Sequence, residues 1–173
     1  YADDAAVFKS RIEKTSKALD TLWSEEDGIY LNRRYDTKEF SHKLSPTLFY
    51  AFFDKSISKE RASRMISEHY FNENEFCGEF VIPTISKNDR SFPEQYYWRG
   101  RIWAPVNFLV YLAFKNHEEL SKAKCDLIEK SYKLLMKEWA ENKHVHENYN
   151  AITGEGCDVE SSDRFYHWGA LLG

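Results

Sequence analysis

Two kinds of helix-forming segment alternate along this 173-residue chain. In the first kind, apolar side chains recur every three or four residues on one stripe, opposite polar ones, as in an amphipathic helix. In the second kind nearly every side chain is apolar or aromatic, as in LFYAFF at 48–53, which is typical of a helix buried on all sides. The predicted helices span 4–23, 46–54, 58–70, 102–115 and 117–140, and a sixth begins in RFYHWGALL at 164–172.

The order amphipathic helix, long loop, apolar helix, short connection occurs three times. The loops repeat too: LWSEEDGIYLNRRYDT and EWAENKHVHENYNAIT both run from Trp through acidic residues and an alternating segment to Tyr and Thr. Helical hairpins of this kind can close into a ring with the long loops at one end, where a functional cleft would form. The expected fold class is all-α, about three helical hairpins, with short β pieces in the loops at 28–35 (GIYLNRRY) and 79–85 (EFVIPTI).

Charge and composition exclude several classes of function. The formal net charge is −4 with both signs interspersed, whereas a nucleic-acid surface needs clustered Lys and Arg. No apolar run approaches the roughly 20 residues of a membrane span. The three cysteines show no CxxC spacing, and the HxH of His144 and His146 offers only two ligands, so a hydrogen-bonded surface role is expected for these histidines. No metal and no cofactor are predicted, and the compartment is left open.

Aromatic side chains are abundant, with 12 Phe, 11 Tyr and 5 Trp, and their flat faces suit sugar-binding clefts as well as cores. Several gather in QYYWRGRIWAPVN at 95–107, where Trp98 and Trp103 flank Gly100, which lets the backbone approach a neighbour or a ligand closely. This block reads either as a cleft wall or as a Trp-rich helix start packed into the core. Asn107 needs a hydrogen-bond partner, which is a ligand hydroxyl or the backbone.

Glu147 lies in HENYNAITGEG at 146–156. In an extended segment it falls on the face opposite the two histidines, so it would point toward the helix ring, although an exposed Glu is the usual outcome. Nearby carboxylates resemble solvated loop charges: Glu155, Asp158 and Glu160.

Four blocks of the chain, taken in order, resemble the C-terminal half of glycoside hydrolase family 63 and its relatives. That group includes processing α-glucosidase I, mannosylglycerate hydrolase-like enzymes and, more distantly, trehalase. The blocks are SHKLSPTLFYAFF, EFVIPTISKNDRSFPEQYYWRGRIWAPVNFLVY, HENYNAITGEG and DRFYHWGALL. The resemblance covers nearly the whole chain, and its WRGRIW and ENYN blocks are the specific ones.

This resemblance implies an (α/α)6 barrel of six hairpins, with residues 1–173 as its C-terminal part, half a toroid. It also implies hydrolysis of an α-glycosidic bond with inversion, in which one carboxylic acid protonates the leaving oxygen and a second carboxylate activates water. The family pattern places the general base at Glu147. It implies a sugar pocket formed by Trp98, Arg99, Gly100, Trp103, Asn107 and Trp168.

The general acid of the family is an aspartate in the first half of the barrel, and no stretch of this chain resembles its surroundings. The chain begins at Tyr1 without an initiator Met and stops within an apolar run, so it is expected to be a piece and nearly inactive alone. Expected partners are an oligosaccharide or small glycoside, and the missing N-terminal half of the barrel or another chain covering the apolar helices. The alternatives are a carbohydrate-binding module without catalysis and a structural half-barrel.

Overall fold

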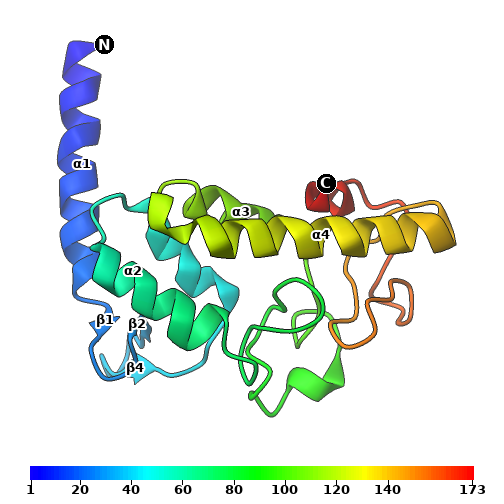
Figure 1. Ribbon diagram of the computed structural model, residues 1–173. Coiled ribbons are helices and arrows are strands. Elements are labelled where there is room, and N and C mark those ends of the chain that lie inside the picture. Colours follow the sequence, from blue (N-terminus) through cyan, green and yellow to red (C-terminus); the bar gives the residue numbers. More distant parts are fainter.

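The computed structural model describes residues 1–173 and is mostly helical (Figure 1). The helices are α1 (Ala2–Asp20), η1 (Pro46–Phe53), α2 (Lys59–Met65), η2 (Ile66–Tyr70), η3 (Phe92–Glu94), α3 (Ala104–Phe114), η4 (Glu118–Leu120), α4 (Ser121–Asn142) and η5 (His167–Leu172). The strands are β1 (Trp23–Ser24), β2 (Ile29–Tyr30), β3 (Asn32–Arg33) and β4 (Phe40–Ser41), which pair as two antiparallel hairpins, β1 with β2 and β3 with β4.

All six predicted helices are present near their expected bounds, but not all are regular α-helices. Residues 46–53 form a 3-10 helix that begins with Pro46, and 66–70 continue α2 as a π-helical turn. Ser58 caps α2 as its sequence position indicates, because its hydroxyl accepts a hydrogen bond from the Arg61 N–H at 3.2 Å. The last helix, at 167–172, is again 3-10.

The alternating segment at 28–35 contains strands as predicted, whereas the strand expected in EFVIPTI at 79–85 is absent. Pro83 has no N–H to donate to a sheet. The flanking backbone groups are used elsewhere, since the Ile82 carbonyl accepts from the Asn107 side chain and the Thr84 N–H donates to the Arg101 carbonyl. The segment is therefore a buried connector between two loops.

The apolar helices lie together and form the core. α3 packs against both η1 and η5, and α4 packs against α3 and η5. Phe49, Phe52 and Phe114 are fully buried there and meet edge to face, with ring centroids 5.6–5.9 Å apart between Phe114 and the other two. The core thus follows the uniformly apolar segments of the sequence.

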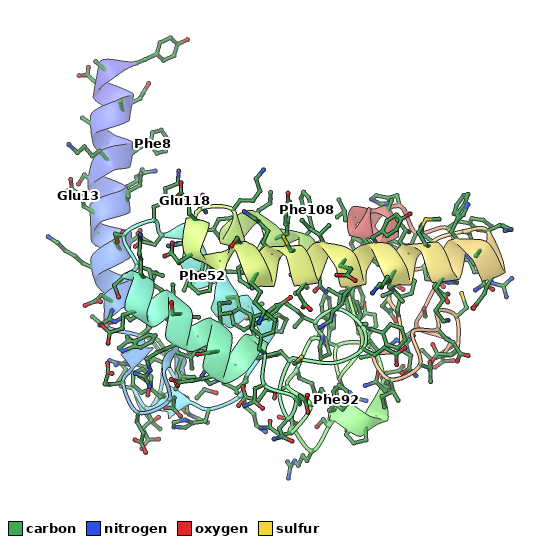
Figure 2. The ribbon with its side chains drawn as sticks, in the orientation of Figure 1. Phe8, Glu13, Phe52, Phe92, Phe108 and Glu118 are labelled. Atoms are coloured by element: carbon green, nitrogen blue, oxygen red, sulfur yellow. The ribbon has the colours of Figure 1, made fainter.

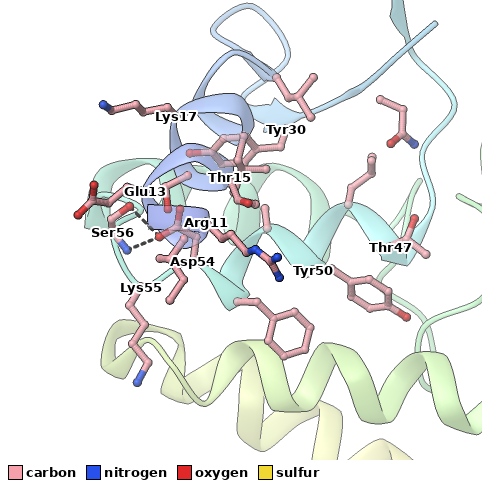
Figure 3. Close-up of a pocket in the computed structure, with 18 of the residues that line it drawn as sticks. Arg11, Glu13, Thr15, Lys17, Tyr30, Thr47, Tyr50, Asp54, Lys55 and Ser56 are labelled. Carbon is pink, nitrogen blue, oxygen red and sulfur yellow. Dashed lines mark hydrogen bonds between the residues drawn. The ribbon is translucent and has the colours of Figure 1, made fainter. Parts of the chain in front are cut away.

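α1 differs from the other helices because none of its residues is buried, and it projects away from the body (Figure 1). Its apolar residues Phe8 and Ile12 are 60% and 64% exposed, and Phe8 stands free of the other elements in Figure 2. Between the base of α1 and η1 lies an apolar hollow of about 1100 Å³ (Figure 3). None of the helices combines the length and apolar character that crossing a membrane requires.

Candidate active site

Two loops that lie far apart in the sequence, the one that leads into α3 and the one that follows α4, contact each other. Ile102, just before α3, pairs with Tyr149 in the segment after α4. The pairing is reciprocal, because each N–H donates to the other residue's carbonyl, at 2.8 and 3.0 Å. This bridge brings the WRGRIW and ENYN blocks side by side.

A buried arginine ties the two loops more strongly. Arg101 is fully buried and forms an ion pair with Asp158, with Nη2 2.5 Å from Oδ1 and Nη1 3.1 Å from Oδ2. Its Nε donates to the side-chain oxygen of Asn148, and Nη1 also donates to the Gln95 carbonyl at 3.0 Å. Although burial raises the pKa of Asp158, hydrogen bonds from Arg101 and Asn150 lower it overall, so the carboxylate is charged.

A tight turn presents the aromatic residues that follow Gln95. The Gln95 side chain donates to the carbonyls of Phe92 and Gly100 and accepts from the Ala151 N–H at 2.7 Å. Gly100 has φ +98°, and a Cβ there would lie 2.5 Å from the Phe92 carbonyl oxygen and 2.6 Å from Gln95 Nε2. Only glycine fits this position without strain, so the close approach predicted for Gly100 is to the chain itself.

Three tryptophans form a continuous aromatic surface. Trp98 stacks on Trp103 with ring centroids 3.9 Å apart and planes 10° apart, and Trp103 contacts Trp168 with centroids 5.7 Å apart. Trp103 is buried and its Nε1 donates to the Tyr97 carbonyl at 3.0 Å, whereas Trp98 remains 46% exposed. Trp98 therefore offers an open ring face on a rigid support.

Glu147 lies next to this surface. Trp168 Nε1 donates to the Glu147 carbonyl at 3.1 Å, and the Glu147 N–H donates to the Asp163 carbonyl at 2.8 Å. The residue is only 8% exposed, yet its carboxylate makes no hydrogen bond or ion pair within the chain. A nearly buried carboxylate without a protein partner keeps its oxygens available to a water or ligand hydroxyl.

The side chains of two further predicted site residues, Arg99 and Asn107, are held by other groups of the chain. Arg99 is exposed, pairs with Glu94 and lies over the Tyr96 ring, 5.2 Å from its centroid. Asn107 is 1% exposed and donates to the carbonyls of Ile82 and Trp103, at 2.9 and 3.2 Å. Its side-chain oxygen has no partner in the chain. Thus direct contacts link Trp98, Trp103, Trp168 and Glu147. Asn107 joins them through the Trp103 carbonyl, whereas the Arg99 side chain does not.

Residues 1–169 match the domain described as the mannosylglycerate hydrolase MGH1-like glycoside hydrolase domain. The chain belongs to this family. The predicted resemblance to glycoside hydrolase family 63 is therefore confirmed.

Individual relatives of this MGH1-like domain cover it almost completely. It is 25% identical over 176 residues to the mannosylglycerate hydrolase of Thermus thermophilus, and the alignment covers 98% of this chain and 38% of that protein. It is 27% identical over 180 residues to the mannosyl-oligosaccharide glucosidase of Saccharomyces cerevisiae, over 89% of this chain and 20% of that protein. A crystal structure of the Thermus thermophilus GH63 mannosylglycerate hydrolase aligns with TM-score 0.72 at 24% identity, over 91% of this chain and 35% of that one.

These values show that the MGH1-like chain spans less than two fifths of the length of these relatives. The structural likeness, at 24% identity, shows the fold.

Two expectations about polar residues near the site are wrong. Asp158 is not a solvated loop charge, because its carboxylate forms the ion pair with fully buried Arg101. His146 has no surface role, because it is 1% exposed and its backbone N–H donates to the buried Tyr149 hydroxyl at 3.1 Å. Both errors come from treating the segment that follows α4 in the MGH1-like domain as an open loop, when its backbone donates to Glu138 of α4 and to Gln95.

The sequence pattern did not indicate which residues organise the site. These are Gln95, Arg101, Asn148 and Asp158. One signal was available, since Arg101 is a charge directly before the apolar run that opens α3, and a buried charge needs a partner. Its partner, 57 residues along the chain, carries no local signal.

Proposed function

We propose that residues 1–173 are the C-terminal part of an (α/α)6 catalytic domain that hydrolyses α-glycosidic bonds with inversion. Glu147 serves as the general base in this proposal. The observation that supports it is the setting of Glu147, which is nearly buried, has an unpaired side chain, and accepts through its backbone carbonyl from Trp168, beside the Trp98–Trp103 stack. An exposed Glu147, remote from the tryptophans, would have removed the basis of the proposal.

The chemistry assigns one task to each part. The Glu147 carboxylate takes a proton from a water molecule, whose oxygen attacks the anomeric carbon as the bond to the leaving oxygen breaks. The leaving oxygen receives a proton from a carboxylic acid on the opposite side of the sugar. We assign that acid to an aspartate outside this chain, as the family resemblance implies, so the chain by itself is nearly inactive.

The tryptophans bind the sugar in this proposal. The open face of Trp98 stacks on the apolar face of a pyranose ring, and Trp103 keeps Trp98 in place from behind. Trp168 fixes the Glu147 backbone and so sets the position of the base relative to that ring. Gly100 shapes the turn. Sugar contacts of Arg99 and Asn107 stay predictions, and these side chains would have to change position to make them.

The substrate class follows from the names of the relatives. They include a mannosylglycerate hydrolase, a mannosyl-oligosaccharide glucosidase and a cytosolic neutral trehalase. We therefore propose a mannosyl or glucosyl glycoside, either small or part of an oligosaccharide, with no metal or other cofactor.

The second partner is the N-terminal half of the same barrel, or another chain that takes its place. The exposed apolar side chains support this: Phe8 and Ile12 on α1, Phe53 at the end of η1 and Leu109 on α3. They lie on the helices that would form the inner and outer rings, and a complete barrel would cover them.

A binding module without catalysis is the second candidate, and the half-exposed Trp98 favours it, because a stacking platform binds sugar with or without a general acid. A structural half-barrel is the third candidate, and under this hypothesis no sugar binding is expected.

The test uses the whole protein that contains this chain. Glu147→Gln keeps the size and burial of the side chain but removes the base, so we expect the turnover of mannosylglycerate or an α-glucoside to fall about 10²- to 10⁴-fold. Sugar binding, followed by tryptophan fluorescence, should persist. The anomer of the first product, read by NMR, tests inversion.

The matched control is Glu155→Gln, an exposed carboxylate in the same loop, which should leave turnover unchanged. Equal activity of Glu147→Gln and the wild type would refute the base assignment. Binding without turnover in the wild-type whole protein would favour the module, and the absence of sugar binding would favour the structural role.

A further inference from the structure

Three side chains outside the sugar site stand in a row behind the ENYN block. Glu138 comes from α4, His146 from the segment that follows it, and Cys157 from the next loop. His146 Nδ1 lies 2.9 Å from the Cys157 Sγ, and His146 Nε2 lies 2.8 Å from Oε2 of Glu138. The side chains of His146 and Glu138 are each 1% exposed, whereas Cys157 is half-buried. Cys157 is thus the nucleophile of the row, His146 the base and Glu138 the carboxylate.

The surroundings fix the imidazole between its two neighbours. Gly156 leaves space for the ring, since a Cβ at this position would overlap the ring atoms of His146. The Gly156 N–H donates to Glu138 at 3.2 Å, and the Tyr149 ring packs edge-on against the imidazole at 5.4 Å between centroids. The three groups lie in a line and form no site that could hold a metal ion.

The charges around Cys157 define which form of the thiol is present. Burial raises its pKa, hydrogen bonding and charge from Arg164 lower it, and the charges of Glu138 and Asp158 raise it, with a net increase. The resting group is therefore the neutral thiol, and reaction requires a base. Burial raises the pKa of Glu138, but its contacts with His146, Lys137 and the Gly156 N–H lower it overall, so this carboxylate is charged and faces the imidazole.

The Nε2–H of His146 is not aligned on the Glu138 oxygen, so that contact is electrostatic rather than a well-formed hydrogen bond. Its effect is to stabilise the positive charge that appears on the imidazole when Nδ1 takes up a proton. This is the arrangement that activates thiols in proteins, a base within reach of sulfur and a third group behind the base.

We propose that Cys157 is a modification site, a thiol that small carbon electrophiles alkylate with His146 as general base and Glu138 as positioning residue. The S–H proton moves to Nδ1 of His146, Sγ attacks the carbon of the electrophile, the new C–S bond forms, and the leaving group departs with the electron pair of its former bond to carbon. With iodoacetamide as probe, the leaving group is iodide. The proposal is independent of the glycosidase assignment.

The experiment compares the three free cysteines within one molecule, Cys77, Cys125 and Cys157. The purified protein is treated with iodoacetamide at neutral pH, and the labelled fraction at each cysteine is followed over time by peptide mass spectrometry. We expect Cys157 to react faster than the exposed Cys125 although it is less accessible. His146→Gln should slow labelling of Cys157 about 100-fold, the lower end of what a positioned general base contributes.

Control variants separate the base from the fold. His144→Gln changes the neighbouring ring, 4.5 Å from His146, and should leave the rate at Cys157 unchanged. If His146→Gln unfolds the protein, labelling of the half-buried Cys77 rises as well, and Glu138→Gln then provides the decisive comparison, with Cys157 slowed and Cys77 unaffected. Slower labelling of Cys157 than of Cys125 in the wild type would overturn the proposal. So would labelling of Cys157 in His146→Gln and Glu138→Gln at the rate of the wild type.

Discussion

The hollow beside α1 and the surface around Trp98 and Glu147 differ in how they are built. The hollow beside α1 has a volume of about 1100 Å³, but α1 itself contributes no buried residue to the fold (Figure 3). The surface around Trp98 and Glu147 is supported by a fully buried arginine, a reciprocal backbone bridge and a stacked pair of tryptophans. The hollow is lined in part by a helix with no buried residue, whereas the tryptophan surface is backed by a buried polar network.

This difference teaches that the volume of a cavity does not by itself mark a candidate functional site. An apolar hollow next to an uncovered helix is what remains when a neighbouring segment is absent. In a buried ion pair, by contrast, the geometry has to offset the desolvation cost of the two charges. The polar network is therefore the better guide to function here, and the following substitutions measure the difference.

Arg101→Met should have the largest effect on stability. The substitution removes the charge that compensates Asp158 and leaves the side-chain oxygen of Asn148 without its donor. Breaking a buried pair in this way costs about 3 to 5 kcal/mol of unfolding free energy, and the partial exposure of Asp158 favours the lower end. Urea unfolding measures it.

The control is Arg99→Met, which removes a pair whose side chains are both about half exposed. Its cost should stay below about 1 kcal/mol. Equal costs for the two arginines would mean that the Arg101 network does not distinguish this region from the rest of the surface.

Gly100→Ala should come next, at about 2 kcal/mol, because the new Cβ meets the Phe92 carbonyl and the φ of +98° is strained for any other residue. Gly78→Ala is the matched control, since a Cβ at Gly78 would lie 3.9 Å or more from its neighbours and the backbone there is ordinary. Thermal unfolding of the two variants measures the difference. If both lose the same stability, the turn is not as tightly built as the structure indicates.

Phe8→Ser should have the smallest effect, below about 0.5 kcal/mol in the 173-residue chain, because Phe8 is 60% exposed. The same substitution in the whole protein should cost more if the rest of the barrel covers α1. Comparing the two unfolding free energies tests the proposed partner directly. A cost near zero in both would show that the α1 face stays in water.

The helices could be predicted because apolar residues either recur at helical spacing or run together in each segment, although the apolar stripe of α1 is not buried. Leu48, Phe49, Ala51 and Phe52 of LFYAFF are buried as the pattern indicates, whereas Phe53 is 46% exposed and Leu109 of α3 is 39% exposed. The type of helix could not be predicted, since 46–53 and 167–172 differ from α-helices by their hydrogen bonding. The strand expected at 79–85 failed because β propensity says nothing about Asn107, which uses one of its carbonyls.

The candidate site was predictable where a side chain carries its own signal. Glu147 and the tryptophans stand out within short motifs, and their closeness to one another agrees with the family resemblance. Arg101, Asn148 and Asp158 did not stand out, because each is unremarkable locally and acquires its role only when two distant loops meet.

The joining of these loops also sets an order of events during folding. Arg101 and Asn148 are 47 residues apart in the chain, with α3 and α4 between them. In folding, contacts between residues so far apart in the chain are gained later than the local contacts within either helix. The tryptophan platform and its carboxylate are thus expected to come together only after the helical scaffold has docked, so a newly made chain acquires its helices before it acquires a place for sugar.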